Sequence, residues 1–303
     1  MRRLLTSLFA LIMLLSAGTA SAARQDTPEE VEIAPGVTAA PLAMAALNAL
    51  PADSSLVLFA REVLAPGAVV PPTTSQSVGL FSVESGELTV TGGGAASIIR
   101  GGQSAPETPQ PGAEASLSPG DAVLVGVCSE AGFRNDGATP VTFLLAGVAS
   151  LAQASCPDAT PTAVEATTPN LTLQFLALGA VDPPPSLPAR IGITRLTYAP
   201  GAADPQPAPY AGTVLARVET GTFGMTIESG EGVVTRKPAD PSNFFAAQQD
   251  PLIQGIEATL NPGDLIWLRR GTVFQTRNTG ADPATLLVLV FEAATTGAGT
   301  PTA

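Results

Sequence analysis

The feature that most constrains the fold of this chain is an internal duplication. Three short turn-forming segments occur twice, in the same order, and each copy then ends in an apolar stretch. A repeat of this kind indicates two related structural units in tandem, which suits a chain of 303 residues. The repeated segments are Leu64–Ala68 with Tyr198–Ala202, Leu117–Asp121 with Leu260–Asp264, and Arg134–Pro140 with Arg277–Pro283.

Between these turns the chain consists of short apolar stretches separated by Gly, Pro, Asn and Asp, at the spacing of a β-sandwich or β-barrel. The sequence therefore predicts an all-β fold, with one short helix at Pro41–Leu50 outside the repeated units. The expected strands are Ser55–Leu64, Ser77–Val83, Glu87–Thr91, Ala122–Val127 and Val141–Gly147 in the first copy, and Arg190–Tyr198, Thr213–Val218, Phe223–Ile227 and Asp264–Leu268 in the second.

The residue types present exclude several classes of function. Histidine is absent, which removes the commonest general base and the commonest metal ligand. The net charge is −12 and Lys237 is the only lysine, so no stretch can neutralise a row of phosphates and nucleic acid is excluded as a partner. Hydrophobic residues make up 45% of the chain, which is enough to bury two cores.

The N-terminus has the features of an export signal. Residues 1–22 are predicted to be a signal peptide, because Arg2 and Arg3 precede the apolar stretch Leu4–Ser16 and Ala20–Ala22 has the small residues of a cleavage site. The alternative is an uncleaved membrane anchor, although the stretch is short for a span of roughly 20 residues. No later stretch is long and apolar enough to cross a bilayer. We expect a secreted or extracytoplasmic protein of the cell envelope.

The duplication also sets the expected domain boundaries. Residues 23–150 form the first unit and 171–294 the second, joined by an Ala/Thr/Pro-rich linker at 151–170 and followed by a disordered tail at 295–303.

The chain contains two cysteines, Cys128 and Cys156. In an exported protein they can form a disulfide, and two unpaired thiols are the alternative. A cysteine metal site would need further Cys or His ligands, which the sequence lacks.

The repeated glycines and asparagines resemble the two sequence motifs of the cupin family. Each copy keeps the glycines that open and close the first motif, the glycine that opens the second motif and the asparagine that ends it, at the family spacing. The inner Pro and Gly of the second motif are replaced by Gly126 and Cys128 in the first copy, and the resemblance covers nearly all of the chain outside the linker and ends. It implies two tandem cupin-type jelly-roll β-barrels that pack against each other. The residues that carry it are Gly67, Gly86, Gly120 and Asn135 in the first copy and Gly201, Gly221, Gly263 and Asn278 in the second.

The same alignment shows that the metal-holding side chains of the family are replaced. In metal-dependent cupins three His and one Glu hold a divalent metal inside the barrel. This chain has other residues at all eight positions, so the resemblance implies a metal-free bicupin without a cofactor. The replacements are Thr73, Ser75, Gly79 and Ala131 in the first copy and Pro207, Pro209, Val214 and Phe274 in the second.

Strand alternation predicts which side chains face the interiors of the barrels. Because the set is mainly apolar and has no ionisable member, it predicts either barrels packed shut by their own side chains or a small cavity for an apolar or weakly polar ligand. The candidate pocket residues are Thr73, Ser75, Phe81, Ala131 and Phe133 in the first barrel and Pro207, Pro209, Val214, Phe274 and Thr276 in the second; Val83 and Ala216 are expected to face inward as well.

Three functional hypotheses follow, of which one is a purely structural or interaction module at the cell envelope. The first is an exported module without catalysis that binds a small molecule or another protein. The alternative is a metal-independent cupin enzyme of the isomerase or lyase type, working with Tyr210 or a carboxylate, which requires an ionisable side chain inside a barrel.

Two further features leave alternatives open. Trp267, beside Arg269 and Arg270, either forms a ligand-binding rim or packs on the neighbouring domain. The loop Arg236–Gly255, which carries Phe244 and Phe245, is either a lid or a packed surface insertion.

Overall fold

The computed structural model describes residues 30–294 except 52–53, 93–95, 102, 104–105, 151–155, 157–169, 182, 206 and 208. The predicted signal peptide, most of the predicted linker and the tail therefore lie outside the described residues. Within the described ranges no helix is long and apolar enough to span a membrane.

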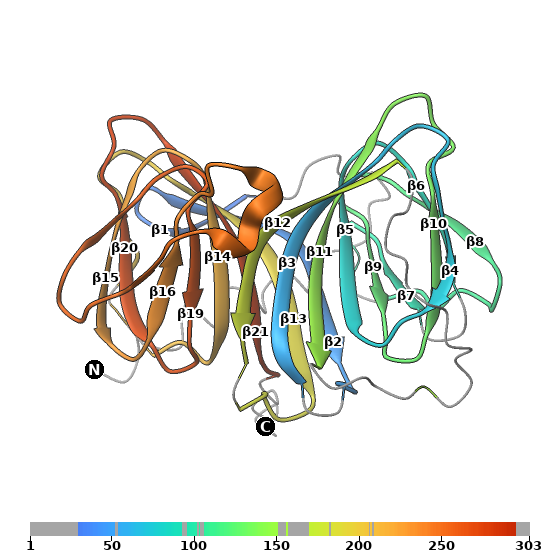
Figure 1. The fold of residues 1–303 in the computed structure, drawn as a ribbon, viewed down its shortest axis with the longest axis horizontal. Coiled ribbons are helices and arrows are strands. Elements are labelled where there is room, and N and C mark those ends of the chain that lie inside the picture. The colour runs from blue at the N-terminus through green and yellow to red at the C-terminus, as the bar shows by residue number, and fades with distance from the viewer. Residues whose placement is uncertain are drawn as a thin grey trace, which may run out of the picture.

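The fold is all-β, as predicted, and the chain forms two jelly-roll barrels that lie side by side (Figure 1). Apart from one 3-10 turn, η2 (Pro241–Ala246), every named element is a strand. The strands are β1 (Val31–Ala34), β2 (Val37–Leu47), β3 (Ser54–Leu64), β4 (Val69–Thr74), β5 (Val78–Ser85), β6 (Leu88–Gly92), β7 (Ala96–Ile99), β8 (Glu114–Leu117), β9 (Ala122–Val125), β10 (Glu130–Arg134), β11 (Val141–Ser150), β12 (Leu171–Ala180), β13 (Ala189–Tyr198), β14 (Gly212–Thr220), β15 (Phe223–Ser229), β16 (Gly232–Thr235), β17 (Gln249–Pro251), β18 (Ala258–Leu260), β19 (Leu265–Leu268), β20 (Val273–Asn278) and β21 (Ala284–Ala293).

Each barrel consists of one large and one small antiparallel sheet. In the first barrel the order β12-β3-β11-β5-β9-β7 faces β4-β10-β6-β8. In the second barrel the order β1-β2-β13-β21-β14-β19-β16-β17 faces β18-β15-β20. The large sheets of the two barrels meet in the middle of the molecule (Figure 1).

The barrels exchange their first strands across the boundaries expected from the sequence. β2 lies near the start of the chain but pairs with β13 of the second barrel, whereas β12 follows the linker and pairs with β3 of the first barrel. The exchange is reciprocal, since Val37 pairs with Tyr198 just as Leu171 pairs with Leu64. Such an arrangement ties the two barrels together through backbone hydrogen bonds.

The predicted helix at Pro41–Leu50 is wrong, because these residues form most of β2. Their Ala, Leu and Met content favours a helix, but ten residues of β2 pair with β13, and this pairing outweighs the weak local preference. A β-bulge leaves Leu42 unpaired, and β12 has the corresponding bulge at Leu176. The duplication therefore extends to this local irregularity.

Three apolar clusters form the core. One fills each barrel, and the third lies between the two large sheets, which confirms that the barrels pack against each other. Trp267 belongs to this contact, because it packs on Gly179 of β12 and its indole nitrogen donates to the Ala180 carbonyl. A Cβ at residue 179 would lie 2.0 Å from the Trp267 ring, so this approach requires glycine.

Four charged residues, two from each copy, form an ion-pair cluster on the contact between the barrels. Arg61 and Arg195 each bind both Glu84 and Glu219, at N–O distances of 2.6–2.8 Å. Arg61 stands three residues before Leu64, and Arg195 stands three residues before its repeat Tyr198. The cluster therefore joins equivalent residues of the two copies. We call it the central ion-pair cluster.

The two motif asparagines hold equivalent turns. The Asn135 amide donates to the carbonyls of Leu64 and Thr139, and its oxygen accepts from the Gly137 backbone. Asn278 makes the same three bonds to Tyr198, Asp282 and Gly280. Because both side chains are buried, the motif residues have a structural reason to recur.

Cys128 and Cys156 form a disulfide in the first barrel. It connects the turn between β9 and β10 to the segment that follows β11. Cys128 has φ near 58°, and the residue at the same place before β20 is Gly271, with φ near 85°.

Candidate functional site

The candidate pocket of the first barrel is filled by aromatic side chains. Phe81, Phe133 and Phe143 lie with ring centroids 4.7–6.2 Å apart, and Ala131 is buried beside them. Thr73 is exposed, and the Ser75 hydroxyl donates to the Ser77 carbonyl. The structure therefore places Phe81, Ala131 and Phe133 together and leaves Thr73 at the surface.

A carboxyl group also lies on the inner face of the first barrel, which corrects the expectation that no ionisable side chain does. Glu62 alternates with Leu64 on β3 and pairs with Phe143, and both of these residues belong to the first-barrel core. Its side chain is buried, and burial raises the pKa of Glu62 to about 7. Glu62 was not among the residues expected to face inward, although it lies two residues from Leu64 on a predicted strand, and side chains two residues apart on a strand share a face.

In the second barrel the predicted residues divide into two groups. Val214 and Thr276 are buried, and Phe274 is half-buried against Tyr210 with ring centroids 5.8 Å apart. Pro207 is half-buried, whereas Pro209 is exposed and forms only an isolated bridge with Val273.

Asp204 is a second correction to the expectation of barrels without ionisable groups. Its carboxylate accepts hydrogen bonds from the Tyr198 hydroxyl and from the Thr276 backbone amide, 2.9 Å away. Burial raises the pKa of Asp204, although these hydrogen bonds oppose the rise. Burial, with a smaller effect of Glu292 and Asp204, raises the pKa of Tyr210 to about 12. Asp204 lies outside the regular strands, so alternation could not place it.

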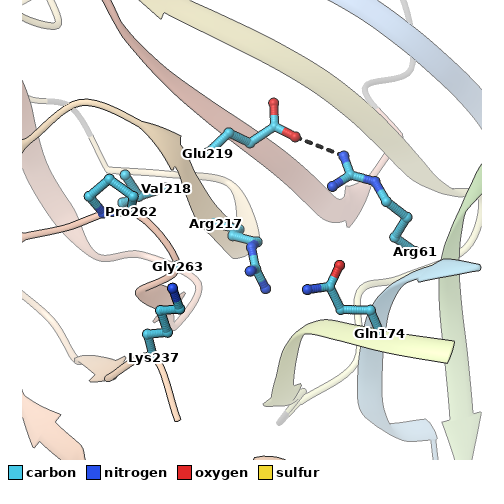
Figure 2. Close-up of a pocket in the computed structure, with 8 residues that line it drawn as sticks. All are labelled: Arg61, Gln174, Arg217, Val218, Glu219, Lys237, Pro262 and Gly263. Carbon is cyan, nitrogen blue, oxygen red and sulfur yellow. Dashed lines mark hydrogen bonds and ion pairs between the residues drawn. The ribbon is translucent and has the colours of Figure 1, made fainter. Parts of the chain in front are cut away.

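A hollow lies between the two barrels. Its volume is about 370 Å³, and we call it the groove. It opens beside the central ion-pair cluster, and Figure 2 shows the Arg217 guanidinium and the Gln174 amide pointing toward each other across it. The groove is lined by Arg61, Gln174, Arg217, Val218, Glu219, Lys237, Pro262 and Gly263.

The groove gathers cations in an acidic protein. Most described arginines are ion-paired, but Arg217 and Lys237 have no carboxylate partner among the described residues, and Arg270, elsewhere on the surface, is the only other such cation in that part of the chain. The half-buried Arg217 has one hydrogen bond, to the Phe175 carbonyl at 3.4 Å. Burial and the nearby Arg61 lower the pKa of Arg217. The groove therefore has unneutralised positive charge.

Glu219 is the one carboxylate that lines the groove, and the arginines of the central ion-pair cluster occupy both of its oxygens. Burial opposes ionisation of Glu219, but hydrogen bonds from Arg195 and Arg61 outweigh this effect and lower its pKa. Glu219 therefore forms its ion pairs with Arg61 and Arg195, and its effect on Arg217 is smaller than those of burial and Arg61.

The groove continues into a smaller apolar hollow of about 50 Å³. Gln174, Arg217 and Lys237 line both hollows, and Phe175, Phe244, Pro238 and Leu265 complete the second. The rings of Phe175, Phe244 and Phe245 lie 5.2–5.7 Å apart in every pairing, and we call them the aromatic wall.

The loop that carries the aromatic wall is anchored at its base. Arg236 donates to Asp250 at 2.7 Å, to Asp264 at 2.8 Å and to the Thr259 carbonyl at 2.8 Å. Phe244 packs on the core between the barrels. The loop is therefore a packed insertion, which was one of the two alternatives, and its Phe244 forms one side of the second hollow.

The duplication supplies an internal comparison for the groove. Ser82 of the first barrel occupies the position of Arg217 in the second. Ser82 pairs with Leu144 and Ala122, and Arg217 pairs with their equivalents Leu287 and Leu265. The backbone amides of Gly101 and Lys237 bind the equivalent carboxylates Asp121 and Asp264. Ala40 pairs with Arg195 as Gln174 pairs with Arg61. We call the surface at Ala40, Ser82 and Gly101 the counterpart face.

The groove could not be found from the sequence because its residues come from separate strands. Gln174 lies on β12, Arg217 on β14 and Lys237 just after β16. The only available signals were the single lysine of the chain and its position at the start of the loop with Phe244 and Phe245. Strand exchange, which brings Gln174 beside Arg61, leaves no mark in the sequence.

Metal binding has no candidate cluster in the described part of the chain. No group of three or more Cys, Asp or Glu side chains there is arranged to hold an ion. The chemistry that the groove offers is electrostatic attraction and hydrogen-bond donation to an anion.

Comparisons with known proteins find similarity of fold. No family model and no curated protein sequence matches the chain. AerE from Microcystis aeruginosa is 13% identical over 88% of this chain and 99% of its own, with a TM-score of 0.43. Vicilin from tomato, Solanum lycopersicum, is 12% identical over 79% and 75%, with a TM-score of 0.42. A cupin superfamily protein from Desulfitobacterium hafniense is 13% identical over 34% and 67%, with a TM-score of 0.23.

Proposed function

We propose that this chain is an exported bicupin without catalysis that binds a small anionic molecule in the groove between its barrels. The observation that carries the proposal is the convergence of Arg217, Lys237 and Gln174 on one hollow, with no carboxylate partner for either cation among the described residues. The ligand class differs from the apolar or weakly polar one expected from the sequence, because the site is not a barrel interior.

The energetics favour an anionic occupant. A half-buried guanidinium loses hydration without gaining a counter-charge, and a bound anion offsets this loss with charge-assisted hydrogen bonds. The volume of about 370 Å³ is within the range of small-molecule sites. Since the chain carries a net charge of −12, the bulk protein repels anions and only a local cationic site can attract them.

Export is supported by the predicted signal peptide at 1–22. The disulfide between Cys128 and Cys156 is consistent with an oxidising compartment.

The test is a binding titration of the mature chain with acetate, inorganic phosphate and, as a cationic control, ethylammonium. We expect an anion to bind and ethylammonium not to bind. Arg217→Gln should weaken anion binding at least tenfold, whereas the matched variant Ser82→Ala on the counterpart face should leave it unchanged. The proposal fails if no anion binds, or if anions bind equally well to Arg217→Gln.

The alternative of a metal-independent enzyme has one observation in its favour, which is Asp204 inside the second barrel. Both of its oxygens already accept hydrogen bonds, from Tyr198 and from the Thr276 backbone. A satisfied carboxylate of this kind is better placed to fix the barrel than to take a proton from a substrate. An isomerase or lyase activity that is lost in Asp204→Asn with the fold intact would favour the enzyme instead.

A further inference from the structure

The groove and the smaller hollow that continues from it form one site with two ends of different chemistry. At one end are the cations and the amide of Gln174, and at the other are Phe175, Phe244, Pro238 and Leu265. Arg217, Lys237 and Gln174 belong to both ends, so they stand where the polar and apolar parts meet. A molecule whose charged group contacts Arg217 therefore has the rest of its body directed along the aromatic wall.

The aromatic wall favours a flat ring as that body. Phe244 and Phe245 meet Phe175 at interplanar angles of 35° and 60°, which are the tilted and edge-on contacts that aromatic rings prefer. An added ring would pack on Phe175 and Phe244, which line the second hollow, and would extend the same packing.

The cationic end favours a carboxylate as the charged group. A planar guanidinium presents paired N–H donors that match the two oxygens of a carboxylate, and Gln174 adds an amide donor at the same place. An amine on the ligand would face Arg217 and Lys237 and be repelled.

The described residues of the counterpart face provide neither the cationic end nor the aromatic end of the site. Ser82, Gly101 and Ala40 replace the two cations and the amide there, and Arg100 and Asp121 are separated by a shorter loop than Arg236 and Asp264. Among the described residues, the aromatic wall and the two cations therefore occur together at the groove, and neither has an equivalent on the counterpart face. A ligand that carries both a negative charge and an aromatic ring would require the cations and the aromatic wall at the same place.

We propose that the groove selects an aromatic carboxylate, an inference that rests on the proposed anion-binding function. The carboxylate lies against Arg217, Lys237 and Gln174, and the ring packs on Phe244 and Phe175. The cations alone would bind any small carboxylate, including acetate, so the selectivity for an aromatic carboxylate comes from the aromatic wall.

The test compares acetate, cyclohexanecarboxylate and benzoate as ligands of the mature chain, by NMR titration. We expect benzoate to bind at least tenfold more tightly than acetate and about threefold more tightly than cyclohexanecarboxylate, which has a similar size without an aromatic face. Phe244→Leu should remove the preference for benzoate over cyclohexanecarboxylate and leave acetate unchanged. Arg217→Gln should weaken all three ligands, and thermal unfolding should show that both variants remain folded.

The outcomes separate this inference from the proposed function. If acetate binds through Arg217 but benzoate binds no more tightly, the anion site stands and the aromatic selectivity is overturned. Equal binding of cyclohexanecarboxylate and benzoate, or a benzoate preference that survives Phe244→Leu, also overturns it. If none of the three binds, the proposed function fails as well.

Discussion

The groove and the counterpart face are built on the same scaffold and differ in the side chains that point from it. The residues that hold the barrels together occur on both sides, as Arg61 and Arg195 or Glu84 and Glu219. The residues that give the groove its charge occur on one side, since Arg217 corresponds to Ser82. The central ion-pair cluster and the motif turns therefore recur in both copies, whereas the cations of the groove occur on one side only.

The largest expected effect tests the claim that scaffold residues are equivalent. Asn135→Ala and Asn278→Ala each remove two donated and one accepted hydrogen bond from a buried turn. At about 1 kcal/mol per bond, each variant should lower the free energy of unfolding by about 3 kcal/mol in chemical denaturation. A difference of more than about 2 kcal/mol between the two variants would show that the turns are not equivalent.

The next largest effect concerns how stability depends on pH. It rests on a difference between the barrel interiors, because Glu62 of the first barrel corresponds to Leu196 of the second. Burial raises the Glu62 pKa from 4.5 to about 7, so the folded state binds the proton more tightly than the unfolded state does. Stability should therefore fall as the pH rises from 4.5 to 7, by at most about 3 kcal/mol. Glu62→Gln should remove this loss.

The measurement is urea denaturation of wild type and Glu62→Gln at pH 4 and pH 8. We expect equal stability at pH 4 and a more stable variant at pH 8. Leu196→Gln is the control, because it should shift the stability by the same amount at both pH values. An equal effect of Glu62→Gln at the two pH values would contradict the raised pKa.

A smaller effect should distinguish the two carboxylates of the central ion-pair cluster. Glu84→Gln and Glu219→Gln each leave two half-buried arginines with one carboxylate, so each should lower the free energy of unfolding by about 1–2 kcal/mol. Only Glu219 lines the groove, so Glu219→Gln should raise benzoate affinity about threefold and by more than Glu84→Gln does. Binding that is weakened in Glu219→Gln would contradict an anion site.

Much of the fold could be predicted because turn residues act locally. The repeated Pro-Gly-Asp and Asn-x-Gly segments mark turns by their own backbone preferences, and the nine expected strands match observed ones. β2 was missed because its strand conformation depends on pairing with β13, more than 140 residues later. The exchange of β2 and β12 depends on the same long-range pairing.

Little of the candidate site could be predicted, for a related reason. Alternation applies to Phe133, Val214 and Thr276 because each lies on a regular strand, and all three side chains are buried. It gave no information about the space between two barrels, where Gln174 and Arg217 meet. The packing of one sheet on the other decides which outward-facing residues line a hollow.

Anomalous diffraction from crystals soaked in 4-bromobenzoate would test most directly whether the groove binds an aromatic anion that the counterpart face does not. A bromine peak should lie beside Phe175 and Phe244, with the carboxylate density at Arg217 and no peak near Ser82 and Gly101. Bromine at both faces, or at the counterpart face alone, would contradict the account.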